Sequence, residues 1–347
     1  MKRELQLLYI SEITWNSNYT VTMIICYRPF TDPYLNIAAE EYFVKNATDD
    51  ICMIWINEKS VIIGKHQNAY GEINYPYVSQ NHIPVVRRIS GGGAVYHDSG
   101  NVNFSFIRKT SNSNPVDFKR FTSVVVQFLQ NLGLEVNINK RNSLFIGEQK
   151  FSGHAEHIFR DRVLHHGTIL WNTDLAALQN CLAPSKSFSS KAMESVRSEV
   201  CNLAPLLPDY TGIQQFTENL VNWLLAYYKD STSYTLQDTD LDAISALAET
   251  KYKTWQWNFG YSPAYSFIVQ IPLRQETEPA VVRVENGKIA GIEPGKDSPG
   301  LPIAAKLQNM LGLLHREEDI DRFVKNNREL LELDGINTVR FTEAFFV

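Results

Sequence analysis

The residues with the clearest chemical potential lie in the run R-R-I-S-G-G-G-A-V-Y-H-D-S-G-N, which spans residues 87–101. Its three consecutive glycines, Gly91–Gly93, lie between two segments that we expect to be strands. Glycine has no Cβ, so this turn lets the backbone touch a ligand and point several N–H groups toward it. Arg87 and Arg88 add fixed positive charge, which suits a carboxylate or a phosphate. The run predicts a site for a bulky anion, with a purely structural turn as the alternative.

Lys150 is the second candidate, and it opens the run K-F-S-G-H-A. Residues 147–149 predict a hairpin turn that places Lys150 at the start of the returning strand. Ser152 and Gly153 follow at once, and their small size lets a ligand come close. An ammonium held beside a phosphate can neutralise its oxygens during a displacement at phosphorus. The alternative is a solvated surface lysine. Asn101 could donate through its amide or simply belong to a turn.

The histidines and cysteines do not predict a metal or thiol centre. His165 and His166 are neighbours on a predicted strand, so their side chains point to opposite faces and cannot easily share one metal. We expect one of them to face a cleft and the other the core. His97 and Asp98 are adjacent on a predicted exposed polar turn, which does not favour a catalytic pair. The four cysteines lack C-x-x-C spacing and a neighbouring histidine, which is typical of reduced thiols in a cytosolic protein.

Helices and strands of an α+β fold must position these residues. Asp32-Pro33 predicts a helix start, because aspartate caps the helix and proline suits its first turn. A second helix is predicted over residues 118–132, ended by Gly133. The Ser-rich, basic stretch 184–191 predicts a mobile surface loop. Strands that alternate with helices and are joined by hairpins predict a mostly antiparallel sheet.

Length and composition predict a two-domain globular protein and disfavour several classes of partner. The chain has 347 residues, of which 44% are hydrophobic, and a formal charge of −5. Acidic and basic residues are well mixed, so we expect neither nucleic-acid nor membrane-surface binding. The predicted division is a large domain over 23–248, a linker over 249–262 and a small α+β domain over 263–347. Residues 1–22 are expected to be an extension that precedes the biological start at Met23.

These motifs, in their order along the chain, resemble the lipoate–protein ligase A family. The matching runs are D-P-Y-L-N-I-A-A-E-E, V-I-I-G-K-H-Q-N, the glycine run, R-N-S, K-F-S-G-H-A, L-H-H-G-T, S-V-R-S-E-V-C-N-L and W-Q-W-N-F-G. They cover residues 23–260, and the remainder is similar to that family's accessory C-terminal domain. The resemblance implies a large catalytic domain of the biotin/lipoate ligase type, with a mostly antiparallel mixed sheet and flanking helices.

The resemblance also implies a two-step reaction. The carboxylate of lipoate attacks the α-phosphate of ATP, and a lysine of an apo lipoyl domain then attacks the resulting lipoyl-AMP. Lys150 is the implied catalytic residue. The implied lipoyl site contains Arg88, Ser90, Gly91, Gly92, Gly93, Ala94, Val95, His157, His166 and Gly167. The implied nucleotide site contains Asn101, Lys150, Ser152 and Gly153.

Cofactor and partners follow from the same resemblance. Magnesium would bind through the phosphates of ATP, and no protein ligand is assigned beyond the candidate Asn142. Ser143 stands where many family members carry aspartate, which leaves a metal or nucleotide contact there open. The implied partners are apo lipoyl domains of 2-oxo acid dehydrogenase complexes or the glycine-cleavage carrier protein. Val85, Val95 and Phe104 are expected to line an apolar tunnel for the lipoyl chain. The protein is expected to be a cytoplasmic monomer.

Two other functions stay open at this point. The first is an octanoyl or lipoyl transferase of the same fold that needs no ATP. Such enzymes with a thioester intermediate require a positioned cysteine, and none is evident here. The second is a non-catalytic protein that binds lipoyl groups or nucleotides. The presence of Lys150 and of the glycine run argues against this alternative. A requirement for ATP tests the first alternative, and transfer to an apo domain tests the second.

Overall fold

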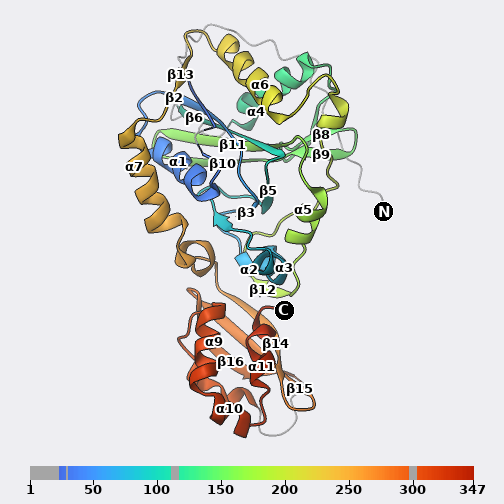
Figure 1. Cartoon of the computed structure of the whole chain (residues 1–347), viewed down its shortest axis with the longest axis vertical. Helices are drawn as coiled ribbons and strands as arrows, with labels where there is room; N and C mark the ends of the chain where they lie inside the picture. The colour runs from blue at the N-terminus through green and yellow to red at the C-terminus, as the bar shows by residue number, and fades with distance from the viewer. Residues whose placement is uncertain (1–22, 29, 111–116, 297–302) are drawn as a thin grey trace.

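The chain folds into a larger body and a smaller C-terminal body that lie end to end (Figure 1). This computed structural model describes residues 23–28, 30–110, 117–296 and 303–347. The extension predicted for residues 1–22 lies outside the described residues. None of the helices within the described ranges has the length and apolarity needed to cross a membrane.

A six-stranded sheet forms the centre of the larger body. Its order is β10 (His154–Phe159), β11 (Arg162–Leu170), β6 (Asn101–Lys109), β2 (Asp50–Trp55), β1 (Met23–Tyr27) and β13 (Thr232–Tyr234). β1 runs parallel to both of its neighbours, and all other pairs are antiparallel. The predicted mixed, mostly antiparallel sheet is confirmed.

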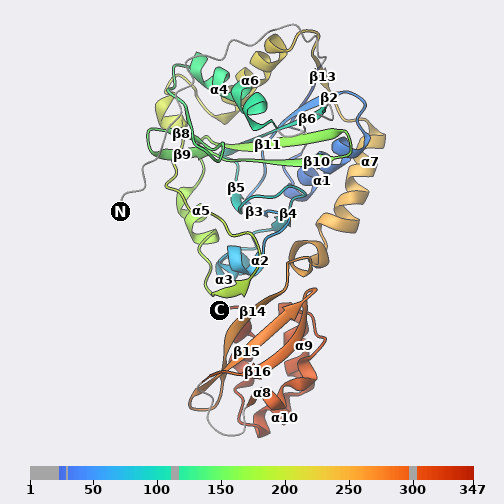
Figure 2. The same cartoon turned by 180° about the vertical axis from the view of Figure 1, so that it is seen from behind.

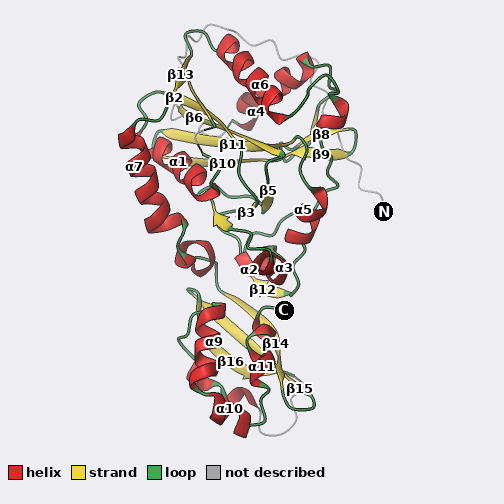
Figure 3. Cartoon of the chain, viewed as in Figure 1, coloured by secondary structure: helices red, strands yellow, loops and turns green. Residues whose placement is uncertain are grey.

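Helices cover both faces of this sheet (Figures 2 and 3). One face packs against α4 (Phe118–Asn131) and α6 (Ile213–Tyr227), and the other against α1 (Pro33–Asn46) and α7 (Asp238–Leu247). α1 begins where the sequence predicts. Asp32 Oδ1 accepts hydrogen bonds from the backbone N–H groups of Tyr34 at 2.7 Å and Leu35 at 3.1 Å. α4 also matches its prediction, and Gly133 follows it with φ of +84°.

Two small sheets carry the residues with chemical potential. β4 (Val85–Arg87), β3 (Ser60–Ile63) and β5 (Val95–His97) form the first, and the glycine run connects β4 to β5. Two short helices, α2 (Ala69–Glu72) and α3 (Tyr75–Gln80), follow β3. β7 (Asn137–Ile138), β8 (Leu144–Ile146) and β9 (Gln149–Ser152) form the second sheet. Its β8–β9 hairpin turns at Gly147, with φ of +56°, and brings Lys150 onto β9 as predicted.

The C-terminal body is a small α+β unit, as expected. Its strands β14 (Tyr265–Pro272), β15 (Thr277–Glu285) and β16 (Lys288–Pro294) are antiparallel. Its helices are α8 (Ile303–Lys306), α9 (Glu317–Asn326), α10 (Arg328–Leu333) and α11 (Thr338–Phe341). Val269, Ile271, Phe341 and Phe345 lie in its core, which also includes Tyr70 from α2 of the larger body.

The Ser-rich stretch 184–191 differs from its prediction as a mobile loop. It contains β12 (Phe188–Ser190), which pairs antiparallel with β14 as the fourth strand of the C-terminal sheet. The edge of β14 supplies hydrogen-bond partners, and the Phe188 ring lies 5.3 Å from that of Phe267, which explains why a strand forms there. The short helix α5 (Leu175–Cys181) precedes this stretch. The predicted linker over 249–262 contains helical turns at Ala248–Tyr252 and Gln256–Gly260. The proposed domain boundaries stay a prediction, and β12 crosses them.

Candidate active site

Two adjoining cavities lie in the larger body beside the glycine run. The larger cavity has a volume of about 690 Å³, and the smaller cavity has a volume of about 490 Å³. Both are lined by Ala94, Val95, Lys150, Gly153, Thr168, Glu194, Ser195 and Val196. Lys150 therefore lies where the two cavities meet, which is where a group transferred between their occupants would react.

The ammonium of Lys150 is free to meet a ligand. In the part of the chain that the structure describes, no oxygen accepts a hydrogen bond from its Nζ atom. A Cβ atom added at Gly153 would lie only 3.1 Å from this Nζ atom, so the glycine leaves room for the ammonium. Burial, and to a lesser degree the charge of Arg141, lowers the pKa of Lys150. A half-buried ammonium without an acceptor gains from an anionic ligand.

The glycine run is held in place by Arg88. The guanidinium Nη2 donates to the carbonyl oxygens of Gly91 at 2.6 Å and Gly93 at 2.8 Å. Nη1 donates to the carbonyl of Ile62 at 3.1 Å, and Nε donates to the hydroxyl of Ser90 at 3.0 Å. Burial lowers the pKa of Arg88 to about 10. The arginine thus fixes the shape of the loop, although the sequence suggested only an anion-binding role.

Arg87 is also bound by the protein itself. Its guanidinium is fully buried and donates to six oxygens, those of Gly64, Lys65, Gln67, Trp257, Asn258 and Ser262. Burial lowers the pKa of Arg87 to about 10. The predicted linker therefore packs onto the segment after β3. Arg87 lines neither cavity. Its guanidinium instead links the segment after β3 to the predicted linker through these hydrogen bonds.

The two neighbouring histidines point to opposite faces of β11, as expected. His166 lines the smaller cavity, together with Gly167. His165 is fully buried on the other face, where its ring stacks on Phe121 with centroids 5.0 Å apart. Burial lowers the pKa of His165 well below its ordinary value. A Cβ atom at Gly167 would come within 2.5 Å of the Phe104 ring, so only glycine fits there.

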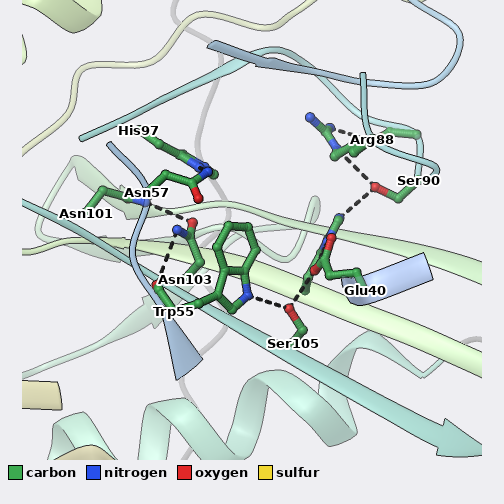
Figure 4. A network of polar contacts seen from close by, with 11 residues as sticks. Glu40, Trp55, Asn57, Arg88, Ser90, His97, Asn101, Asn103 and Ser105 are labelled. Carbon is green, nitrogen blue, oxygen red and sulfur yellow. Dashed lines mark hydrogen bonds and ion pairs between the residues drawn. The ribbon is translucent and has the colours of Figure 1, made fainter. Parts of the chain in front are cut away.

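His97 and Asp98 are buried, which corrects the predicted exposed turn. His97 lines the smaller cavity, and its Nδ1 lies 3.1 Å from Nδ2 of Asn57 (Figure 4). Asp98 accepts hydrogen bonds from the backbone N–H groups of Gly100 and Asp174 instead. Burial lowers the pKa of His97 to about 3. The end of β5 runs inward against the sheet, and the two side chains form no pair.

Several predicted site residues lie away from the cavities. Asn101 is fully buried and donates to Oδ1 of Asn103 at 2.9 Å (Figure 4), and Asn103 is the residue that lines the smaller cavity. His157 and Asn142 line neither cavity, whereas Ser143 lines the smaller one. Ser152 lines the larger cavity. Ser90 and Gly91 support the loop without lining a cavity.

The apolar wall of the smaller cavity differs in part from its prediction. Val95 lines both cavities, but Val85 and Phe104 line neither. Phe104 points to the opposite face of β6 from Asn103, into the core below α4. The apolar lining expected from Val85 and Phe104 comes instead from three residues that the sequence did not single out, namely Ile37, Trp55 and Ile62.

Ser195 was also missed, and it connects the segment after β12 to the glycine run. Its hydroxyl accepts hydrogen bonds from the N–H of Ala94 at 2.8 Å and from Gln67 Nε2 at 3.1 Å, and it donates to the carboxylate of Glu72. Burial raises the pKa of Glu72. The only signal in the sequence is the run S-V-R-S-E-V-C-N-L.

Known proteins share this architecture and sequence. The family described as the lipoyl protein ligase A/B catalytic domain matches residues 32–225. Lipoate–protein ligase 1 of Staphylococcus aureus is 38% identical over 296 residues, which are 84% of this chain and 90% of that protein. Protein Ta0514 of T. acidophilum, solved with bound lipoic acid, is 25% identical and superimposes with a TM-score of 0.59 over 70% of this chain and 100% of that one. A lipoate-protein ligase A bound with ATP is 26% identical, with a TM-score of 0.58 and the same coverage.

Proposed function

The chain belongs to the lipoyl protein ligase A/B family, and from this premise we propose that it attaches lipoate to apo lipoyl domains in an ATP-dependent reaction. The observation that carries the proposal is the position of Lys150 at the junction of the two cavities. A ligase that makes an acyl-adenylate needs an acyl pocket and a nucleotide pocket that meet at the reacting atoms. One unpaired ammonium at that junction suits the charge that develops there.

Each cavity suits one substrate. The smaller cavity has apolar walls at Ile37, Trp55 and Ile62, which fit the dithiolane ring and its aliphatic chain. The larger cavity is the candidate nucleotide site, with Ser152 and Gly153 beside Lys150. The lipoic acid in the T. acidophilum protein and the ATP in the ligase A structure support the pairing of these two substrates on this fold.

The proposed chemistry has two steps. A carboxylate oxygen of lipoate attacks the α-phosphorus of ATP, and the bond from that phosphorus to the bridging oxygen breaks, releasing pyrophosphate. The ε-amine of the acceptor lysine then attacks the acyl carbon of lipoyl-AMP, the bond to the AMP oxygen breaks, and the amine loses a proton. Lys150 binds the acyl and phosphate oxygens and offsets their negative charge in both steps.

Magnesium is part of the proposal through the phosphates of ATP. When bound there, it would screen their charge and make pyrophosphate a better leaving group. The described residues contain no group of three or more His, Cys, Asp or Glu side chains that could hold a metal ion. We propose that the ion arrives on ATP and takes most of its ligands from phosphate and water.

The partner and the setting are the finer parts of the proposal. We propose that the acceptor is a lipoyl domain of a 2-oxo acid dehydrogenase complex or the glycine-cleavage carrier protein, and that the enzyme is a cytoplasmic monomer. The solved bi-partite lipoate protein ligase of Thermoplasma acidophilum, described with its E2 lipoyl domain, supports the class of acceptor. Mass measurement of an apo lipoyl domain after incubation with the enzyme, lipoate and Mg-ATP tests the whole proposal.

Lys150→Ala is the sharper test of the mechanism. Removal of one preorganised donor to a developing oxyanion typically lowers kcat by about 10²–10³-fold. Lipoate-dependent exchange of pyrophosphate into ATP should fall by at least this factor, while the melting temperature stays near that of the wild type. Exchange at the wild-type rate would remove Lys150 from the mechanism.

The thiols give little support to the ATP-independent transferase. Cys26, Cys52 and Cys181 are buried, and burial raises the pKa of each. Burial also raises the pKa of Cys201, which lines neither cavity. A thioester intermediate needs a reactive thiolate at the site. Acyl transfer from an octanoyl carrier protein without ATP would nevertheless favour that alternative.

A further inference from the structure

We propose that Glu40 is a positioning residue for the acyl site, because one of its carboxylate oxygens fixes two walls of the smaller cavity and the glycine run. Glu40 lies on α1 and is fully buried, and it touches no cavity itself. Its Oε1 atom lies 2.7 Å from Nδ1 of His166 and accepts the hydroxyl proton of Ser105 at 2.6 Å. The inference rests on the proposed function only in taking the smaller cavity as the lipoyl site.

The first branch from Glu40 leads to the glycine run. Nε2 of His166 lies 2.6 Å from the hydroxyl oxygen of Ser90. This oxygen accepts from Nε of Arg88 at 3.0 Å (Figure 4). Arg88 in turn holds the carbonyl groups of Gly91 and Gly93. The carboxylate is therefore connected to the loop through three side chains.

The second branch leads to the indole of Trp55. Its Nε1–H donates to the hydroxyl oxygen of Ser105 at 2.8 Å, and the hydroxyl of Ser105 donates a hydrogen bond to Glu40 (Figure 4). Trp55 and His166 both line the smaller cavity. A single oxygen atom thus fixes the orientation of two aromatic walls that belong to β2 and β11.

The carboxylate of Glu40 selects one tautomer of His166. A carboxylate can only accept hydrogen bonds, so Nδ1 of His166 carries a proton and donates it to Oε1 of Glu40 at 2.7 Å. In this tautomer Nε2 accepts the hydroxyl proton of Ser90 at 2.6 Å. The hydroxyl oxygens of Ser90 and Ser105 are left to accept from Arg88 and Trp55, whose N–H groups can only donate.

The order Ser90, His166, Glu40 resembles a nucleophile, a base and an orienting acid, but the geometry excludes acyl transfer through Ser90. The serine is 1% exposed and lines neither cavity. Its oxygen already accepts from Arg88. No acyl carbon can reach this oxygen while the loop keeps its shape, so the chain of bonds acts on position rather than on reactivity.

Three measurements test the role of Glu40. The first is the ¹⁵N NMR signature of His166 in the wild-type enzyme, which should report protonation at Nδ1 and does not depend on any variant folding. The second compares Glu40→Met, which fills the space without an acceptor, with Glu40→Gln, which keeps one. We expect Glu40→Met to raise the KM for lipoate about tenfold, a loss typical of a hydrogen bond to a charged group, with the KM for ATP unchanged.

The third measurement asks whether Glu40→Gln keeps the KM for lipoate that Glu40→Met loses, with a variant of the neighbouring Glu41 as the matched control. Glu40→Gln should keep the KM for lipoate within threefold of the wild type, because its amide oxygen can accept from His166 and Ser105. Glu41→Gln is the control: Glu41 is 3% exposed and binds Lys45, Lys251 and Tyr252 instead. It should lower the melting temperature and leave the KM for lipoate unchanged.

The outcomes separate this inference from the proposed function. A proton on Nε2 of His166, or a Glu40→Met enzyme whose KM for lipoate stays within twofold of the wild type, would overturn the positioning role. A Glu40→Gln enzyme as impaired as Glu40→Met would overturn it too. Wild-type enzyme without any lipoate-dependent exchange would instead refute the proposed function, and the NMR result would stand.

Discussion

Replacement of Gly64 by alanine tests whether the glycine run must lie where the structure has it. Gly64 follows β3, and a Cβ atom added there would lie 2.1 Å from the carbonyl oxygen of Gly92 and 3.2 Å from the carbonyl carbon of Gly91. Ordinary contact begins at 3.4 Å, so the backbone of the run must move by about 1.3 Å, the difference between 3.4 and 2.1 Å. The obstacle is backbone, so no rotation of a side chain can relieve it.

The displacement should damage catalysis more than folding. A misplacement of about 1 Å commonly lowers activity about 10²-fold, and overpacking costs about 1–3 kcal/mol of stability. We expect kcat/KM for lipoate in the pyrophosphate exchange assay to fall about 100-fold, and the circular dichroism spectrum to stay that of a folded protein. Gly91→Ala is the matched control, because a Cβ there meets nothing within 4 Å. Equal activity of the two variants would refute the reasoning.

Two further perturbations test stability. Burial lowers the pKa of His97, His154 and His315 to about 3 each. Their unfolded pKa is about 6.5, so only the unfolded chain takes up these protons, and the free energy of unfolding should fall below about pH 6.5, by up to about 2 kcal/mol per histidine at pH 5. Urea midpoints that agree at pH 7 and pH 5 would contradict this. Lys186→Met should speed amide hydrogen exchange over residues 338–347, because Nζ of Lys186 donates to the carbonyl of Ala344 at 2.7 Å. Unchanged exchange there would show that this bond does not hold the C-terminus.

Local rules explain what could be predicted from the sequence. The start of α1 follows from the capping chemistry of Asp32, and the hairpin before Lys150 follows from its glycine turn. The opposite orientation of His165 and His166 follows from the period of a strand. Each of these features depends on residues that are close in the sequence.

The features that escaped prediction depend on contacts between distant segments. The contact of Ser195 with Glu72 spans 123 positions, and that of Arg87 with Asn258 spans 171. The sequence shows that Arg87 and Arg88 are charged, but only the fold shows that carbonyl groups surround them. Likewise, Asn101 stands in a suggestive motif, and its place on β6 directs it to Asn103 rather than to a cavity.

The strand β12 has a consequence for any attempt to separate the two bodies. It leaves the larger body, adds to the edge of β14, and returns as the segment that carries Ser195 to the cavities. A protein cut after residue 262 would keep Phe188 and its neighbours with no strand to pair with, so an apolar edge would be open to other chains. The cut would also remove the strand that anchors one end of the segment carrying Ser195. Expression of the larger body alone should therefore yield protein that self-associates. Co-expression of residues 263–347 should prevent this self-association, because β14 is then available to pair with β12.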